Sequence, residues 1–353
     1  MGNKYYADVL IPVYKPDEKL DHLLTMLAMQ TILPEHVILM MTLTGAELDQ
    51  ELLQKYAVSI PNYFHAGKLP KEFRDTSWWQ QGGYSEKEIK RMDIELYTIP
   101  KKKFDHGGTR NAAADLSNEE FIIFMTQDAV PENEKLIEYL LESFEERQVG
   151  AAYARQIPTE DAGEIERYTR IFNYPETSYL KTAKDKKILG IKTYFCSNVC
   201  AAYRKSAYDE LGGFVCHTIF NEDMIMAAKL IEAGYAIQYA ANAKVVHSHN
   251  YNCKQQFKRN FDLAVSQIEY QEYFGNVKSE SEGIRLVIKT MKHLFHVGKW
   301  YLLPKLIMQS GAKYLGYRFR KKYQTLPPAW VRAFSLNKEY WKQKENNNMK
   351  KVG

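Results

Sequence analysis

The sequence predicts an α/β fold with an open, mainly parallel central sheet and helices on both of its faces. Three observations support this. Apolar runs of strand length recur along the first half of the chain, they do not alternate with polar residues, and stretches with helical periodicity lie between them. Continuous apolar strands separated by helices are typical of a parallel sheet that is covered on both faces. Ligands of such sheets bind at the carboxyl ends of the strands.

The first two strand–helix units lie within the first 60 residues. Strands are expected at 7–14 (ADVLIPVY) and 36–43 (HVILMMTL). The amphipathic stretch 16–30 predicts a helix with Asp17 as its N-cap, and 46–58 predicts a second helix.

Two more units follow, with strands expected at 94–100 (IELYTIP) and 121–126 (FIIFMT) and helices at 108–117 and 132–147. The polar, aromatic and Gly-rich segment 61–88 predicts a long surface loop, and long ordered loops are often functional. Residues 155–192 are irregular again, which suits a segment lying over an active-site mouth.

The composition is that of a globular protein in a reducing compartment. The chain has 353 residues, 45% hydrophobic and 26% charged, enough for one large or two ordinary domains. Its four cysteines, Cys196, Cys200, Cys216 and Cys253, form no C-x-x-C pair and predict buried thiols. The N-terminus lacks a signal-peptide pattern, and no apolar run approaches the roughly 20 residues of a membrane span. These features predict a cytoplasmic chain.

The C-terminal region is strongly basic. Residues 284–353 contain 16 Lys and Arg against 2 acidic residues, a charge of +14, whereas the preceding residues carry −9. We expect a division into residues 1–275 and a basic helical region at 276–353. Residues 284–323 have the periodicity of helices with one apolar and one basic face, broken near Pro304. They predict either a packed helical subdomain or helices that lie on an anionic membrane surface. No RNA-binding signature is present, so nucleic acid is not the expected partner.

Asp128 and an acidic pair are the first candidates for chemistry. Asp128 follows the strand at 121–126, where it either caps the next helix or binds a hard cation such as Mg²⁺ or Mn²⁺. Glu222 and Asp223 begin a helix, where they either match the helix dipole or include a general base that removes a proton from a sugar hydroxyl.

Further candidates lie at 247–259 and 105–111. His247 and His249 share one face of a strand end, as metal ligands or as structural histidines. Gln256 and Arg259 align on one helix face. In FDHGGTRNAA, the glycine pair permits close backbone approach, Arg110 has the geometry of a phosphate clamp, and the helix N-terminus adds positive charge.

Seven segments follow one another in a recognisable order: LIPVYKP, FDHGGTRNAA, MTQDAVP, YFCSNVCAAYRKSAYDELGGF, FNEDMIMAAKLIEAGY, VVHSHNY and QQFKRNF. This order resembles the inverting family-2 glycosyltransferases of GT-A fold, in particular the bacterial rhamnosyltransferase branch that uses dTDP-L-rhamnose. The resemblance covers about residues 5 to 275. Thr126 stands where most relatives have an additional aspartate, and Asn260 replaces a tryptophan.

The resemblance implies a role for each matching residue. Asp223, with Glu222 beside it, would be catalytic, and Asp128, His247 and His249 would bind Mg²⁺ or Mn²⁺. Asn198, Gln256 and Arg259 would contact the acceptor. The nucleotide sugar would contact Pro12, Val13, Tyr14, Asp105, His106, Gly107, Gly108, Arg110, Asn111, Gln127 and Asp128.

The resemblance also implies the partners. These are a dTDP-L-rhamnose donor and a saccharide acceptor carried on undecaprenyl diphosphate at the inner face of the plasma membrane, with peripheral attachment of the chain and a possible homo-oligomer. Two alternatives stay open: the same mechanism with a UDP-hexose or UDP-N-acetylhexosamine donor, and a non-catalytic protein that binds nucleic acid or lipid.

Overall fold

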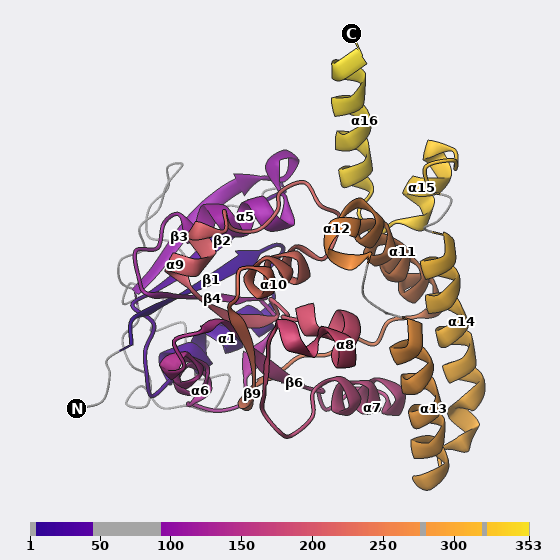
Figure 1. Cartoon of the computed structure of the whole chain (residues 1–353), viewed down its shortest axis with the longest axis horizontal. Coiled ribbons are helices and arrows are strands. Elements are labelled where there is room, and N and C mark those ends of the chain that lie inside the picture. The colour runs from indigo at the N-terminus through magenta and orange to yellow at the C-terminus, as the bar shows by residue number, and fades with distance from the viewer. Residues whose placement is uncertain (1–4, 45–92, 276–279, 320–322, 353) are drawn as a thin grey trace.

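The computed structural model describes residues 5–44, 93–275, 280–319 and 323–352 (Figure 1). The expected helix at 46–58 and the loop at 61–88 lie outside these residues. One sheet contains the described strands in the order β3-β2-β1-β4-β8-β6-β9-β5, with β7 beside β9. The strands are β1 (Ala7–Val13), β2 (His36–Leu43), β3 (Asp93–Pro100), β4 (Phe121–Met125), β5 (Val130–Pro131), β6 (Val149–Ile157), β7 (Tyr179–Lys181), β8 (Cys200–Arg204) and β9 (Ala236–Val246).

The sheet is mainly parallel, as predicted. Parallel pairings join β3, β2, β1 and β4, and β6 also pairs with β9 in parallel. Because β8 lies antiparallel between β4 and β6, the strands on its two sides run in the same direction. Only β5, β7 and β8 oppose the others among the described strands. The four expected strands are all present, within two residues of their predicted bounds.

Helices cover both faces of the sheet, because successive strand side chains point to opposite sides. On one face, Val9 and Ile11 pack with leucines of α1 (Glu18–Ala28) and α6 (Leu136–Glu142). On the other face, Leu10 packs with apolar residues of α5 (His106–Ala114), α9 (Lys205–Glu210) and α10 (Glu222–Glu232).

Some helix bounds differ from those predicted. Asp17 is the N-cap of α1 and accepts a hydrogen bond from Lys19 N at 3.1 Å, as expected. Helix α5 begins two residues early because Asp105 caps it, and α6 is much shorter than the expected 132–147. Residues 155–192 are more regular than predicted, since they contain α7 (Glu164–Asn173), β7 and α8 (Lys186–Leu189).

The C-terminal region is helical, as expected. It consists of α13 (Glu280–His296), α14 (Leu303–Phe319), α15 (Pro328–Phe334) and α16 (Lys338–Val352), with the break near Pro304 at residues 297–302. Helix α13 packs against α7, and α14 packs against α11 (Cys253–Glu269), which is followed by the short α12 (Gln271–Phe274) (Figure 1). Helices α15 and α16 share an apolar cluster with the sheet-containing part: Ile219, Phe261 and Val265 contact Val331 and Trp341. No helix in the described parts of the chain is both long enough and apolar enough to span a bilayer. The division at residues 275 and 276 stays a prediction.

Candidate active site

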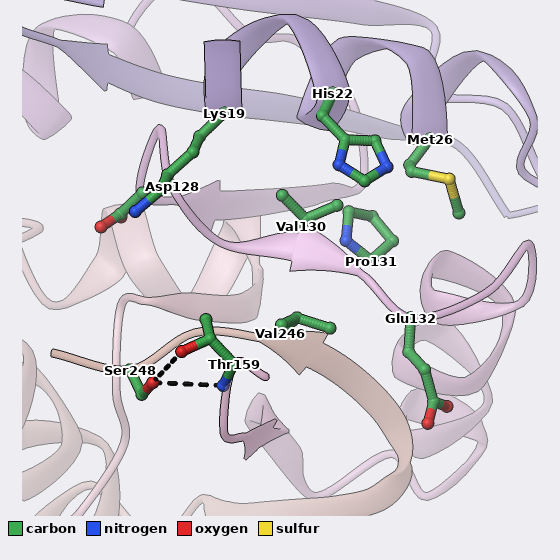
Figure 2. A pocket seen from close by; sticks show the side chains of 10 residues that line it. All are labelled: Lys19, His22, Met26, Asp128, Val130, Pro131, Glu132, Thr159, Val246 and Ser248. Carbon is green, nitrogen blue, oxygen red and sulfur yellow. Dashed lines mark hydrogen bonds between the residues drawn. The ribbon is translucent and has the colours of Figure 1, made fainter. Parts of the chain in front are cut away.

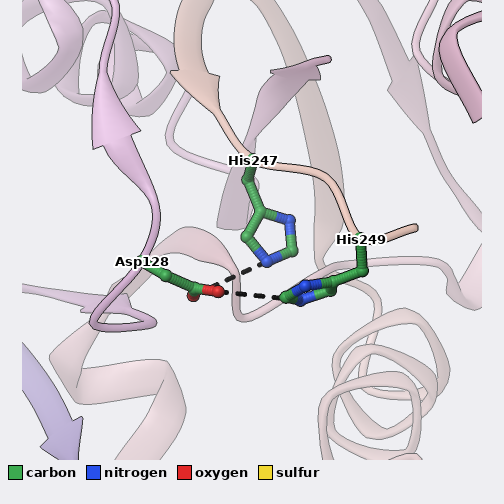
Figure 3. Close-up of side chains that lie close together, drawn as sticks. All are labelled: Asp128, His247 and His249. Carbon is green, nitrogen blue, oxygen red and sulfur yellow. Dashed lines mark ion pairs between the residues drawn. The ribbon is translucent and has the colours of Figure 1, made fainter. Parts of the chain in front are cut away.

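Asp128, His247 and His249 form one cluster (Figure 3). One carboxylate oxygen of Asp128 lies 3.6 Å from His247 Nε2, and the other lies 3.6 Å from His249 Nε2. The sheet register explains the arrangement. Val130 pairs with Val246 in antiparallel strands, so continuing the register places Asp128 opposite residue 248, between the two histidines.

The cluster has the chemistry of a cation site. The helix after Asp128 begins only at Leu136 and Lys135 occupies its N-cap, so Asp128 is not a helix cap. Burial lowers the pKa of His247 to about 3, and burial also lowers the pKa of His249, so both rings are neutral and have a free nitrogen lone pair. One ligand atom from each residue lies within 4.8 Å of the others. These residues fit a divalent cation.

The two carboxylates at the start of α10, Glu222 and Asp223, have different environments. Glu222 is buried and its Oε1 lies 3.2 Å from Arg110 Nη1. Asp223 is partly exposed, and its carboxylate accepts hydrogen bonds from Met224 N at 2.7 Å and Asn198 N at 3.4 Å. Burial, and then the charge of Glu222, raises the pKa of Asp223 to about 7. Asp223 is therefore the member of the pair that suits a general base.

The cation cluster and Asp223 are joined by the segment 197–199. On one side, Thr126 N, two residues before Asp128, donates to Val199 O at 3.1 Å. On the other side, Asn198 N donates to Asp223. These hydrogen bonds connect the turn that contains Asp128 to the start of α10, and the roles of Asp128 as cation ligand and Asp223 as base stay predictions.

Gln156 connects the same segment to the histidines. Its amide nitrogen donates to Ser197 Oγ at 3.1 Å, and its oxygen lies 3.3 Å from His247 Nδ1 and also accepts from Arg170. This bond orients His247 with Nε2 toward Asp128. Neither Gln156 nor Arg170 was predicted from the sequence. Both residues lie in the segment 155–192 that was singled out, but neither has a sequence signal of its own: Gln156 is at the end of β6 and Arg170 is one of several charged residues of α7.

The residues of FDHGGTRNAA mainly hold the site together, which corrects part of the prediction. Asp105 accepts from Gly108 N at 2.7 Å and from His217 N at 3.0 Å, so the Gly108 amide is already used. A Cβ on Gly107 would lie 2.0 Å from Val215 O, so the glycine permits helix–loop packing rather than ligand approach.

Three further residues of this motif also face inward. Arg110 is buried against Glu222 and is not an open phosphate clamp. The side-chain amide of Asn111 donates to the backbone oxygen of Phe214 and accepts from the backbone nitrogen of Phe214. Its oxygen also accepts from Tyr208 Oη at 2.5 Å. Burial lowers the pKa of His106, whose ring packs edge-on to Phe104. These contacts leave the motif as a support for the acidic pair.

Of the residues predicted to line a nucleotide pocket at the end of β1, Tyr14 presents its ring at the surface. Val13 is buried in the core, so its side chain does not line a nucleotide pocket as predicted. Pro12 is partly exposed, and Tyr14 is 40% exposed with Lys15 and Lys101 near its ring. Gln127 ties the Asp128 turn to Tyr14 by bonds to its backbone N at 2.7 Å and O at 3.1 Å.

The predicted acceptor residues lie near Asp223 or near His249: Asn198 bonds Asp223, Gln256 lines a cavity with His249, and Arg259 lies by Tyr251. Asn198 is buried, accepts from Tyr203 Oη at 2.8 Å, and has an amide nitrogen without a hydrogen-bond partner in the described residues. Gln256 is buried on α11, and Arg259 stacks over Phe220 with its guanidinium 4.6 Å from the ring centre.

Two cavities flank the cation cluster. Asp128 lines one of about 350 Å³, with Thr159 and Ser248, which are hydrogen-bonded at 2.7 Å (Figure 2). His249 lines the other, of about 320 Å³, together with Gln256 and residues of α7 and α14. The site therefore has room for ligands on both sides of the cluster.

Comparisons with known proteins identify the family of the chain. Residues 83–212 match the model of the glycosyl transferase family 2. The chain is 41% identical over 261 residues to the O-antigen chain rhamnosyltransferase WbaN of Salmonella anatum, covering 73% of this chain and 82% of that protein. It is 40% identical over 264 residues to the O-antigen chain rhamnosyltransferase RfbN of Salmonella typhimurium, covering 74% and 83%.

A solved structure shows the same fold. The mannosyltransferase PcManGT of Pyrobaculum calidifontis, in complex with GDP-Man and Mn²⁺, superimposes with a TM-score of 0.50 at 12% identity, over 97% of this chain and 86% of that one. The fold is thus GT-A, and the alternative of a non-catalytic binding protein is not supported. The chain belongs to glycosyl transferase family 2, with O-antigen rhamnosyltransferases among its relatives, and is a glycosyltransferase.

Proposed function

We propose that this glycosyltransferase transfers L-rhamnose from dTDP-L-rhamnose to a lipid-linked saccharide, with inversion at the anomeric carbon. Its product would be an α-L-rhamnoside in a bacterial cell-surface polysaccharide. Rhamnosyl transfer is supported by the two relatives at 41% and 40% identity. The structural observation behind the mechanism is Asp223, a partly exposed carboxylate with a pKa raised to about 7, which hydrogen bonds through the segment 197–199 connect to the strand end that carries Asp128.

The residues divide the work of a direct displacement. Asp223 accepts the proton of the acceptor hydroxyl as its oxygen attacks, and a pKa near neutrality keeps a large fraction of the carboxylate ionised. Glu222 stays paired with Arg110 and supports α10. Asp128, His247 and His249 would hold a divalent cation, which would supply positive charge to the leaving diphosphate.

The ligand set favours Mn²⁺ over Mg²⁺. Two of the three ligands are imidazole nitrogens, whereas Mg²⁺ prefers oxygen ligands and Mn²⁺ tolerates both. Titration of Mn²⁺ and Mg²⁺ into the protein should give tighter binding of Mn²⁺, and replacement of Asp128 by Asn should weaken both. Equal affinities would remove this preference.

The donor is tested by offering a panel of sugar nucleotides with Mn²⁺. The panel contains dTDP-L-rhamnose, UDP-glucose, UDP-galactose and a UDP-N-acetylhexosamine, and the release of nucleoside diphosphate is measured with and without EDTA. We expect turnover with dTDP-L-rhamnose, loss with EDTA, and loss with Asp223→Asn. Turnover only with a UDP-sugar would refute dTDP-L-rhamnose as the donor but would leave the proposed mechanism in place.

We also propose that α13 and α14 attach the protein to an anionic membrane surface. Nine large apolar side chains of the segment 284–315 are 49–65% exposed: Ile284, Ile288, Phe295, Trp300, Tyr301, Ile307, Met308, Tyr314 and Leu315. Basic residues lie among them, including exposed Arg285, Lys289, Lys292 and Lys305. Apolar side chains with interspersed cations are typical of interfacial helices.

Liposome co-sedimentation tests the membrane proposal. The whole chain is used, because α15 and α16 complete the apolar cluster with Phe261 and Val265. Trp300→Ser with Tyr301→Ser should reduce recovery with anionic vesicles, and Trp330→Ser, on exposed α15, is the control. Equal recovery of the wild type with neutral and anionic vesicles would refute it.

A further inference from the structure

Helix α14 contributes a wall of the cavity beside the cation cluster. The cavity of about 320 Å³ is lined by His249, Tyr251 and Gln256 on one side and by Lys305, Gln309 and Lys313 on the other. These three α14 residues are spaced by four, so they form one stripe along the helix. Of the two proposed membrane helices, α14 therefore also lines a cavity of the candidate active site.

Two contacts fix the position of this stripe. Gln309 Nε2 donates to Tyr251 O at 3.2 Å, two residues after His249. Three residues beyond Lys313, a Cβ on Gly316 would lie 2.2 Å from Phe257 O, so only glycine permits α14 to approach α11 this closely. The glycine thus brings Lys313 to the cavity that His249 lines.

Positive charge is in excess around Lys313. Its pKa is lowered by burial and by the charges of Arg259 and Arg170, against the opposing effect of Glu166. Glu166 is already paired with Arg170 at 2.7 Å. Among the described residues neither Lys313 nor Arg259 forms an ion pair with a carboxylate.

The acidic residues on the cavity wall do not offset this charge. Glu164 holds His293 and Lys299, each at 2.7 Å, and Glu166 holds Arg170. Asp161 is the remaining carboxylate of the lining. Its one negative charge is outnumbered by three positive groups, Lys305 and Lys313 of the lining and the nearby Arg259. A desolvated ammonium group among other cations is stabilised by an anion.

We propose that Lys313, with Arg259, binds a diphosphate group in the cavity beside His249. A diphosphate has enough oxygen acceptors for two cations, and a cation held by the histidines would add a third positive charge. The proposal rests on the proposed function, in which both the nucleotide donor and the lipid-linked acceptor have a diphosphate. The C-terminal region would then contribute a substrate-binding residue as well as membrane contacts.

Inorganic pyrophosphate is the first probe, because its binding does not depend on which donor is correct. Its affinity is measured by calorimetry with Mn²⁺ in excess, for the wild type, Lys313→Met, Lys313→Arg and Lys338→Met. Lys338 is an exposed lysine at the start of α16 and controls for the loss of one charge from the C-terminal region. We expect Lys313→Met to weaken binding about tenfold or more, Lys313→Arg to retain most of it, and Lys338→Met to bind as the wild type does. Unchanged affinity in Lys313→Met, or an equal loss in Lys338→Met, would overturn the proposal.

Steady-state kinetics then distinguish the two sources of diphosphate. If the group belongs to the donor, Lys313→Met weakens binding of dTDP and raises the KM for the sugar nucleotide. If it belongs to the acceptor, dTDP binding is unchanged and the KM for the lipid-linked acceptor rises. Pyrophosphate binding that depends on Lys313 without turnover of any sugar nucleotide would refute the proposed function and keep the anion site.

Discussion

Arg110 and Glu222 form a buried ion pair, with 3.2 Å between Nη1 and Oε1, that joins α5 to the first residue of α10. In this pair, Arg110 compensates the negative charge of Glu222 next to Asp223. Burial and the charge of Glu222 raise the pKa of Asp223, and the charge of Arg110 lowers it. Arg110 thus acts on the proposed base through Glu222 and through its own charge, without being an open phosphate ligand.

Removal of Arg110 should be strongly destabilising. Arg110→Met leaves Glu222 buried without its partner, and the loss of one member of a buried pair costs about 3–5 kcal/mol. The double variant Arg110→Met with Glu222→Leu should lose much less stability than Arg110→Met alone, because no buried charge is left. Urea unfolding of the two variants and of Glu222→Leu forms the cycle, and additive losses would show that the two residues are not coupled.

The pH dependence of turnover should report Asp223. With a pKa raised to about 7, the base is protonated at low pH, so kcat/KM should rise with pH and level off above that value. Asp223→Asn should lower kcat by roughly 10²–10⁴-fold and remove this limb, with sugar-nucleotide binding retained. A variant that keeps wild-type kcat would end the assignment of the base.

Asp223 should also make stability pH-dependent. Since its folded pKa lies above its ordinary 3.8, the folded state holds the proton more tightly than the unfolded state. Stability from this group is present below about pH 4 and is lost as pH rises through about 7. Asp223→Asn should therefore raise the melting temperature relative to the wild type more at about pH 8 than at about pH 4. Thermal unfolding at both values tests this sign.

The first four strands followed from local pattern, because β1, β2 and β4 are almost entirely apolar runs of strand length and the carboxyl ends of parallel strands form the ligand edge of a sheet. Asp128, His247 and His249 were predictable for that reason: strand ends in one sheet lie near one another. The inward orientation of Arg110 and Asn111 was not predictable. Asn111 bonds the loop 214–217 and Arg110 pairs with Glu222, both more than 100 residues later in the chain. A glycine pair before a helix does not indicate whether a ligand or a loop fills the space.

The cation cluster should depend on a residue that does not bind the cation. Gln156 contacts His247 Nδ1 at 3.3 Å and Ser197 Oγ at 3.1 Å, which fixes the ring orientation. Gln156→Ala should weaken Mn²⁺ binding by roughly 10–100-fold, typical of a lost partner of a metal-binding histidine. His247→Ala should weaken it more, and His296→Ala, at the exposed end of α13, should not change it. Mn²⁺ affinity measured by electron paramagnetic resonance tests the order, and an unchanged affinity in Gln156→Ala would contradict it.

Gly107 should be intolerant of any side chain. Its Cβ position lies 2.0 Å from Val215 O and 2.9 Å from Val215 C, which are backbone atoms that Asn111 and Asp105 hold in place through Phe214 and His217. Gly107→Ala must therefore separate α5 from this loop, at a cost of about 1–3 kcal/mol. The separation would also lengthen the Arg110–Glu222 contact, so turnover should fall together with stability.

Gly283→Ala is the matched control for that substitution. Gly283 is also helical, on α13, and no atom of the described residues lies within 4 Å of its Cβ position, so alanine there should stabilise by about 0.5–1 kcal/mol through its higher helix propensity. The midpoint of urea unfolding should rise in Gly283→Ala and fall in Gly107→Ala. Turnover should fall in Gly107→Ala alone. If Gly107→Ala unfolds at the same urea concentration as the wild type, the 214–217 loop is not held against α5 as the structure has it.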